Sequence, residues 1–157
     1  MRKLRPYIIS VAIALGVGTL SALITKDSMN IYKSINQPPL APLSILFPIV
    51  WSILFILMGI GAAMVYVRKD EMPKAVSCAL STYAVNLVVN FMWSIIFFNF
   101  RAFLFAFIWL LFLLVVIIKM IIDFWKVSRA ASILQIPYLL WVTFAGYLNL
   151  AIFILNR

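Results

Sequence analysis

Residues 102–118 read AFLFAFIWLLFLLVVII, a run of 17 residues that contains no charged side chain. A helix needs about 20 residues to cross the hydrocarbon core of a bilayer. Lys119 can extend its side chain toward the interface, so the helix can continue to residue 122. A strand of a membrane barrel would alternate apolar and polar residues, whereas this run is apolar throughout. The run therefore predicts a transmembrane helix.

The same pattern recurs, because the charged residues leave uncharged stretches at 6–25, 34–67, 75–100 and 130–156. The second stretch is too long for one helix, and its first third is rich in proline, which predicts a loop to about residue 43. We therefore predict an all-α fold, an integral membrane bundle that forms one domain over residues 1–157. The predicted spans are approximately 7–25, 44–67, 75–99, 102–122 and 132–154.

Composition agrees with a membrane protein and excludes several functions. Of the 157 residues, 66% are hydrophobic and only 11% are charged, against roughly a quarter charged in a typical soluble domain. The chain has no histidine and a single cysteine, Cys78, so it offers neither imidazole ligands nor a thiolate cluster. We predict no metal site and no cofactor. The net charge of +9 does not predict nucleic-acid binding here, because basic residues flank membrane spans.

The basic residues are distributed unequally between the two sides of such a bundle. The N-terminal side has nine of them, Arg2, Lys3, Arg5, Arg68, Lys69, Lys74, Lys119, Lys126 and Arg129. The other side has four, Lys26, Lys33, Arg101 and Arg157. Because cytoplasmic loops carry the excess of Lys and Arg, we predict a multi-pass protein of the cell membrane with its N-terminus in the cytoplasm and its C-terminus outside.

The third span carries polar side chains on one face. Tyr83, Asn86, Asn90, Trp93 and Phe97 follow one another at steps of three and four residues, which places them along one side of a helix. Amides that face lipid are costly, so this side should point into the bundle. The amides then either hold helices together or form part of a ligand site, and the third span alone does not decide between these.

Spans 2 and 5 carry aromatic residues at helical spacing. Span 2 has Phe47, Trp51 and Phe55, and one face of span 5 has Tyr138, Trp141, Ala145 and Asn149. A pocket of indole and phenyl rings with a few amides would suit a large, flat, mostly apolar ligand. No carboxylate is expected well inside a span, which disfavours ion-coupled transport. Trp109 lies off the polar faces and is expected to face lipid.

Several stretches together resemble one known family. They are YKSINQPPLAP at 32–42, FPIVW at 47–51, Met-Gly at 58–59, NFMWSIIFF at 90–98, PYLLWVTFA at 137–145, and Leu-Asn at 148–149 and 155–156. In combination they resemble the translocator protein family, also called the TspO/MBR family, peripheral-type benzodiazepine receptors or tryptophan-rich sensory proteins. The chain is similar to a bacterial member.

The resemblance implies five helices, a pocket that opens toward the first loop, and a homodimer in the lipid bilayer. It implies a porphyrin or related tetrapyrrole as ligand, and possible binding of benzodiazepine-type drugs. By matching position, the pocket residues would be Tyr32, Pro42, Trp51, Phe55, Asn86, Asn90, Trp93, Trp141 and Ala145. Tyr138 joins them because it shares a face of span 5 with Trp141 and Ala145.

The chain departs from the family pattern in ways that bear on its ligand. Gln37 stands where a lysine usually precedes the double proline, and Leu40 stands where an aromatic residue usually follows it. Leu150 and Ile154 occupy the positions of the tyrosine and the basic residue of the sterol motif found in the animal branch, so we expect no sterol site there.

Three functions remain open from the sequence. The first is a sensor, regulator or translocator that binds porphyrin-like molecules. The second is an enzyme that degrades porphyrin with light and oxygen, with Trp51 and Trp141 as the redox partners. The third is a membrane scaffold for partner proteins.

Overall fold

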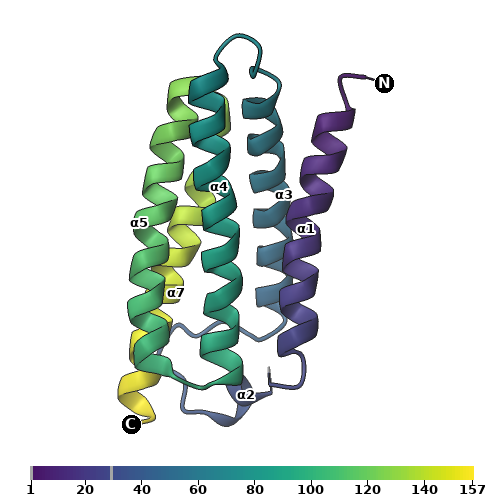
Figure 1. Cartoon of the computed structure of the whole chain (residues 1–157). Coiled ribbons are helices and arrows are strands. Elements are labelled where there is room, and N and C mark those ends of the chain that lie inside the picture. The colour runs from purple at the N-terminus through teal and green to yellow at the C-terminus, as the bar shows by residue number, and fades with distance from the viewer. Residues whose placement is uncertain (1, 29) are drawn as a thin grey trace.

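The computed structural model describes residues 2–28 and 30–157 and shows a bundle of long helices (Figure 1). The long helices are α1 (Arg5–Thr25), α3 (Leu46–Tyr66), α4 (Pro73–Ser94), α5 (Phe103–Val127) and α7 (Ile136–Leu155). Short elements join or extend them, namely α2 (Ile31–Ser34), the π-helix η1 (Ile95–Asn99) and α6 (Arg129–Ile133). The described residues contain no strand, so the all-α prediction is confirmed.

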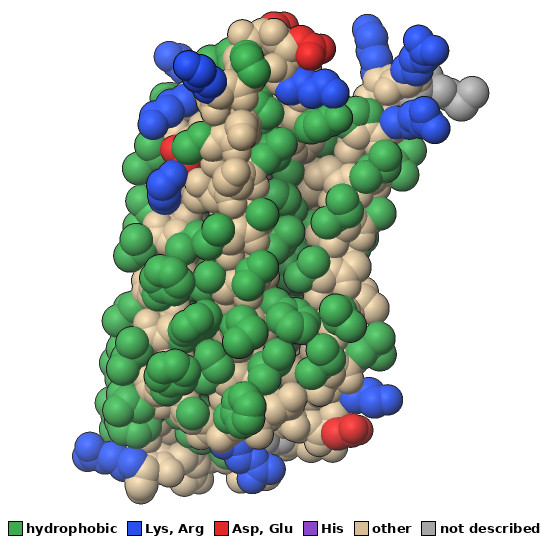
Figure 2. All heavy atoms as spheres, viewed as in Figure 1, with side chains coloured by type: hydrophobic (Ala, Val, Ile, Leu, Met, Phe, Trp, Pro, Cys, Tyr) green, Lys and Arg blue, Asp and Glu red, His purple; other side chains and the backbone are tan. Residues whose placement is uncertain are grey.

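Five segments are long and apolar enough to cross a membrane, which confirms the predicted five-helix membrane bundle. They are Arg5–Thr25, Leu46–Tyr66, Pro73–Asn99, Phe103–Val127 and Arg129–Leu155. Figure 2 shows a hydrophobic band over the middle of the visible face, with Lys and Arg gathered at its two ends. Because the number of spans is odd, the two termini lie at opposite ends of the bundle (Figure 1). We call these the N-terminal end and the α2 end.

Small residues let α1 and α3 approach closely. A Cβ atom on Gly59 would lie 2.6 Å from Cα of Val11, so only glycine fits at this crossing. Ser10 Oγ donates a hydrogen bond of 2.7 Å to the carbonyl of Gly59, which fixes the same crossing. Gly18 approaches α3 as closely, but the group it meets is the ring of Phe55, a side chain, and not the backbone. These small residues therefore serve packing within the chain, as bundles in lipid require.

The last span is divided into two helices. α6 ends at Ile133 and α7 begins at Ile136, with Pro137 in the first turn of α7, where its missing N–H costs nothing. The side chain of Gln135 occupies the break. Its Nε2 donates to the carbonyls of Leu57 on α3, at 3.3 Å, and of Ala131, at 3.2 Å.

One carboxylate, Asp123, lies near the end of a span and beyond the end that the sequence predicts for it. The fourth helix continues past residue 122 to Val127, and Asp123 is only 5% exposed within it. Thr82 of α4 donates to Asp123 Oδ2 at 2.8 Å, and Lys119 forms an ion pair with the same oxygen at 2.6 Å. The sequence predicts that this span ends at residue 122, directly before Asp123, but these partners make the buried carboxylate tolerable. The cluster lies near the N-terminal end.

Candidate ligand-binding cavity

A cavity of about 270 Å³ lies in the half of the bundle next to α2. α1, α2, α3, α4 with η1, and α7 all contribute to its wall. The lining residues are Leu15, Gly18, Thr19, Ser21, Ala22, Thr25, Tyr32, Phe47, Pro48, Trp51, Ser52, Phe55, Asn90, Trp93, Ser94, Phe97, Phe98, Ala145, Leu148, Asn149 and Ile152. The wall is thus mainly apolar and aromatic, with two amides and several hydroxyls, which is the usual composition of a small-molecule pocket.

The structure brings together most of the side chains that the sequence proposed for the site. Those that line the cavity are Tyr32, Trp51, Phe55, Asn90, Trp93 and Ala145. The other four, Pro42, Asn86, Tyr138 and Trp141, do not line it. They lie directly behind the wall or over the mouth, so they can act on a ligand only through the residues that do line it.

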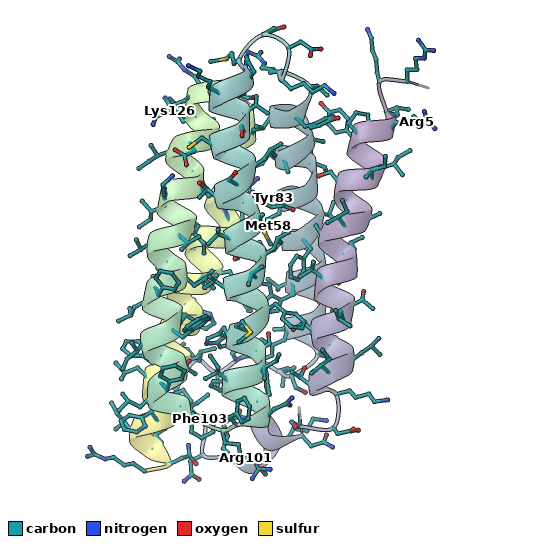
Figure 3. The ribbon with its side chains drawn as sticks, in the orientation of Figure 1. Arg5, Met58, Tyr83, Arg101, Phe103 and Lys126 are labelled. Atoms are coloured by element: carbon teal, nitrogen blue, oxygen red, sulfur yellow. The ribbon has the colours of Figure 1, made fainter. Side chains whose placement is uncertain are left out.

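Asn86 and Tyr138 are locked in a hydrogen-bonded chain behind the wall. Asn86 is 0% exposed and Tyr138 1% exposed. Asn86 Nδ2 donates to the sulfur of Met58 at 3.6 Å, and the hydroxyl of Tyr138 donates to Asn86 Oδ1 at 2.7 Å. Asn90 Nδ2 donates in turn to the Tyr138 hydroxyl at 2.8 Å. The chain therefore runs from the middle of the bundle, where Met58 lies (Figure 3), to the cavity wall.

Trp93 and the rings of η1 form an aromatic part of the cavity wall. Its indole Nε1 donates to Asn149 Oδ1 at 3.1 Å, and Asn149 Nδ2 donates to the carbonyl of Phe103 at 2.8 Å. The ring of Phe97 stacks on Trp93 with centroids 5.3 Å apart, and Phe98 meets it edge-on at 6.3 Å. The π-turn places these two rings together beside Trp93, and such turns recur at functional sites.

Trp51 and Trp141 have different positions although both were proposed as redox partners. Trp51 lines the cavity and its ring lies 5.7 Å from that of Phe55. Trp141 stands behind Phe47, with ring centroids 5.9 Å apart, and its buried Nε1 has no hydrogen-bond partner among the described residues. Only Trp51 can therefore contact a ligand in the cavity directly.

Trp109 lies away from the cavity, as the sequence indicates, but it is not a purely lipid-facing side chain. It is partly buried, and its Nε1 donates to the carbonyl of Val89 on α4 at 2.8 Å. The indole therefore joins α5 to α4 outside the cavity. Sequence periodicity could not show this, because the accepting carbonyl is a backbone group that carries no residue signature.

Sequence reasoning missed the contribution of α1. Leu15, Gly18, Thr19, Ala22 and Thr25 all line the cavity. The small residues Gly18 and Ala22 allow close packing, and Gly18 packs on the ring of Phe55. The small side chains also leave open space beside that ring. The available signal was the group of three hydroxyl residues in the second half of the span, Thr19, Ser21 and Thr25, all of which line the cavity.

The first loop, residues 35–43, and α2 cover the α2 end of the cavity. The hydroxyl of Tyr32 donates to the carbonyl of Pro42 at 2.9 Å, and its ring meets Phe47 edge-on at 4.9 Å. Pro42 thus acts through Tyr32. Burial raises the pKa of the Tyr32 phenol above its ordinary value. The hydroxyl therefore stays protonated, and this bond stabilises the fold at every pH below about 10.

Two side chains near the C-terminus hold the first loop against α7. Asn156 Oδ1 accepts from the backbone N–H of Asn36 at 3.0 Å, and Asn156 Nδ2 donates to the carbonyl of Asn36 at 2.9 Å. The hydroxyl of Tyr147 donates to the carbonyl of Pro39 at 2.8 Å. The cover of the cavity is thus tied at two points to the last helix.

Comparison with known proteins agrees with this architecture. Residues 10–155 match the model of the TspO/MBR family. The chain belongs to the TspO/MBR family. It is 35% identical over 150 residues to the tryptophan-rich protein TspO of Chlorobaculum tepidum, which covers 93% of this chain and 92% of that protein. It is 36% identical over 125 residues to the protein CrtK of Rhodobacter capsulatus, covering 80% of this chain and 78% of that one.

Two further relatives, one of them from an animal, are also similar to this chain. The translocator protein of Bos taurus is 31% identical over 133 residues, covering 84% of this chain and 79% of that protein. The tryptophan-rich sensory protein of Cereibacter sphaeroides is 28% identical over 138 residues, covering 88% and 83%. Membership of the TspO/MBR family and five apolar helices together make this chain a multi-pass membrane protein.

Proposed function

We propose that this member of the TspO/MBR family binds porphyrin-like tetrapyrroles, or other large flat apolar molecules, in the aromatic cavity and acts as a sensor or regulator or as a translocator. The observation that carries the proposal is the cavity wall itself. Trp51, Phe55, Trp93 and Phe97 present ring faces and edges to one space, and Asn90 adds an amide. Rings of this kind stack on flat ligands, while single polar groups orient them.

The size of the cavity indicates how such a ligand would lie. A volume of about 270 Å³ is slightly smaller than that of most ligand pockets, which usually measure about 300–1,000 Å³. A tetrapyrrole would therefore reach out of the cavity toward the first loop, or move Tyr32 aside. Lys26, directly after α1, and Lys33, in α2, are exposed at the α2 end of the bundle. An acidic edge of a ligand would therefore meet cations there.

The decisive experiment is a titration of the purified protein with protoporphyrin, in the dark and under light, followed by spectra of the recovered pigment. We expect saturable quenching of tryptophan fluorescence in the dark and an unchanged pigment. Because no imidazole is present, haem should bind no more tightly than metal-free porphyrin. Absence of saturable binding would refute the proposal. A new pigment formed only in light and oxygen would instead establish the degrading enzyme.

We also propose the membrane orientation that the basic residues favour. Arg5 and Lys126 mark the N-terminal end in Figure 3 and Arg101 marks the other. By the positive-inside rule the N-terminal end faces the cytoplasm. Reporter domains that are active on only one side of the membrane, fused to each terminus, test this. A cytoplasmic reporter that is active at the C-terminus would contradict the orientation.

Finally, we propose that the protein forms a homodimer. The outward faces of α1 and α4 carry small exposed residues, among them Ala12, Gly16, Ser77 and Ser81. A Cβ on Gly16 would meet no atom within 4 Å, so a second helix could approach closely there. The mass of the protein in detergent, for the native chain and for Gly16→Leu and Ser81→Leu, tests this. A native chain that is monomeric at all concentrations would refute it.

A further inference from the structure

An apolar stripe runs along the outer face of α5 toward the N-terminal end of the bundle. Val115, Ile118, Ile122 and Trp125 follow one another at steps of three and four residues, so they lie on one side of the helix. Each of them is between 47% and 65% exposed, and none lines the cavity. We call these four residues the α5 stripe. Its upper end is the end of α5 at which Lys126 is labelled in Figure 3.

The backbone brings an arginine back over the end of this stripe. α5 ends at Val127, and Ser128 is extended, with φ −151°, and caps α6 by accepting a hydrogen bond from the N–H of Ala131 at 3.3 Å. The guanidinium of Arg129 lies over the indole of Trp125, 5.2 Å from the ring centroid. A guanidinium stacked on a ring still has its N–H groups along the edge for other partners. Among the described residues Arg129 has no carboxylate partner.

Lys126 gives the same end of the stripe a second cation. Its side chain is 66% exposed, and its ammonium lies 3.8 Å from Asp123 Oδ1. Lys119 already pairs with the other oxygen of this carboxylate at 2.6 Å. The single negative charge of Asp123 is thus matched by Lys119, and the charges of Lys126 and Arg129 remain in excess. The end of the stripe therefore attracts an anion.

An anionic phospholipid fits this surface better than a second protein chain does. The stripe consists of large side chains, whereas helices that pack on one another in membranes use small ones. Copies of this chain lie parallel in a membrane, so a symmetric contact along the stripe would bring like charges together. An acyl chain can lie along isoleucine side chains, with the indole ring at the level of the headgroups. The phosphate would then meet Arg129, whose guanidinium can bind two of its oxygens.

We propose that the outer face of α5 binds one anionic phospholipid from the leaflet at the N-terminal end. The phosphate lies between Arg129 and Lys126, and an acyl chain lies along Ile122 and Ile118. Trp125 is a positioning residue, because its ring holds the guanidinium at the head of the stripe. The site lies outside the cavity, so the inference does not rest on the proposed function.

Native mass spectrometry of the full chain in detergent tests the proposal, because it resolves the binding of single lipids. The chain is titrated with dioleoylphosphatidylglycerol and, separately, with dioleoylphosphatidylcholine, whose choline group carries a positive charge. We expect the first phosphatidylglycerol to bind more tightly than the first phosphatidylcholine by about 5- to 25-fold, since each of two cations contributes about 5-fold. Arg129→Gln and Lys126→Gln should each lower this preference by about 5-fold. Both side chains are exposed, so Tm should stay native.

The matched control is Lys69→Gln, which removes one positive charge at the same end of the bundle. The ammonium of Lys69 lies over the ring of Tyr66, 4.6 Å from its centroid, and donates to the hydroxyl of the same residue at 2.9 Å. Lys69 is thus also stacked on an aromatic ring, but it follows α3 and does not belong to α5. The variant should keep the native preference for phosphatidylglycerol.

The positioning role of Trp125 is tested by a double-mutant cycle. Trp125→Leu keeps an apolar side chain in the stripe but removes the ring under the guanidinium. We expect the preference for phosphatidylglycerol to fall by about 2- to 5-fold. In the Arg129→Gln background the same change should have no further effect on the preference. Arg129→Lys restores the charge and should recover part of the preference, which a loss through misfolding would not.

Three results would overturn the inference. Equal preference in the native chain and in Arg129→Gln would show that the cation binds no headgroup. An equal loss in Lys69→Gln would show that the cations act only as diffuse surface charge. A dimer fraction that changes in Arg129→Gln while lipid binding stays native would assign the stripe to a second copy of the chain.

Discussion

The two ends of the bundle are built from the same helices but packed in opposite ways. Toward the N-terminal end, polar side chains pair with one another across helices, as Asp123 does with Thr82 and Lys119. At the α2 end, aromatic rings surround a cavity of about 270 Å³, and the first loop covers it. One end is filled and the other is hollow.

The difference shows how a small membrane protein can hold an open cavity. Empty space costs contacts that a filled core would keep. Here the filled end supplies close helix contact, such as Gly59 against Val11. The hollow end is then held by specific hydrogen bonds, such as that from Trp93 to Asn149. The N-terminal end thus contributes mainly to stability and the α2 end mainly to ligand binding, and this separation can be tested.

We expect the largest effect on stability from a glycine substitution at the filled end, and we compare it with a glycine substitution beside the cavity. In Gly59→Ala the new methyl group would lie 2.6 Å from backbone Cα of Val11, which cannot move without shifting α1. We expect a loss of about 1–3 kcal/mol of stability, measured as a lower Tm in detergent. In Gly18→Ala the methyl group would meet the ring of Phe55, also at 2.6 Å, and this ring can turn into the cavity. That variant should keep its Tm and lose ligand affinity.

Gly16→Ala is the matched control for both changes. A Cβ there would meet no atom of the same chain within 4 Å, and alanine keeps the position small for the proposed dimer contact, so neither Tm nor affinity should fall. An equal drop in Tm for Gly59→Ala and Gly18→Ala would mean that the two ends are packed alike. The proposed separation of stability from binding would then be wrong.

The ion pair at the filled end should respond asymmetrically to its two single changes. Lys119→Met leaves the buried carboxylate of Asp123 with Thr82, the thiol of Cys78 at 3.8 Å and a weaker contact to Lys126 at 3.8 Å. We expect a loss of up to about 3 kcal/mol of stability. Asp123→Asn leaves a lysine whose side chain is 57% exposed and can reach water. That variant should lose only about 1 kcal/mol.

Thermal unfolding of both variants in the same detergent measures this asymmetry. Ligand affinity should remain native in each, because neither residue lines the cavity. A greater loss for Asp123→Asn than for Lys119→Met would show that burial of the carboxylate is not what the pair compensates.

A tryptophan series sharpens the comparison at the hollow end. Trp51→Phe reduces stacking area in the cavity wall and should weaken protoporphyrin binding by roughly 2- to 10-fold. Trp141→Phe should have a smaller effect, because Trp141 lies behind Phe47. Trp109→Phe removes the bond to the Val89 carbonyl and should lower Tm without changing affinity. Equal effects of all three on affinity would mean that these tryptophans form no common site.

The smallest effect is expected at the cover of the cavity. Asn156→Ala removes both hydrogen bonds between this side chain and the backbone of Asn36. Because these bonds are exposed, the fold should stay intact while the loop opens more often. We expect ligand dissociation to be faster by about 3- to 10-fold, measured by stopped-flow fluorescence. Thr143→Ala, which removes an exposed hydroxyl elsewhere on α7, should leave the rate unchanged.

Much of the site followed from sequence where the signal was local. The steps between Asn86, Asn90 and Trp93 placed them on one face of a helix, and the structure keeps them on one side of α4. The same periodicity could not separate Asn86, which is sealed behind the wall, from Asn90, which lines the cavity. The two residues are one helical turn apart. Their different exposure to the cavity depends on the position of Tyr138 of α7, whose hydroxyl lies between the two amides.

By itself the sequence determined the number of spans and the all-α fold, and it excluded imidazole ligands and a cluster of thiolates. Hydropathy, helical period and composition are properties of neighbouring residues, so they need no knowledge of the partner helix. The tertiary structure alone decided that α1 helps to line the cavity, that Trp109 bonds to Val89, and that Asp123 is buried with partners. Each of these depends on the rotation of one helix against another. That rotation is fixed by contacts between residues far apart in the chain, such as Gly59 with Val11.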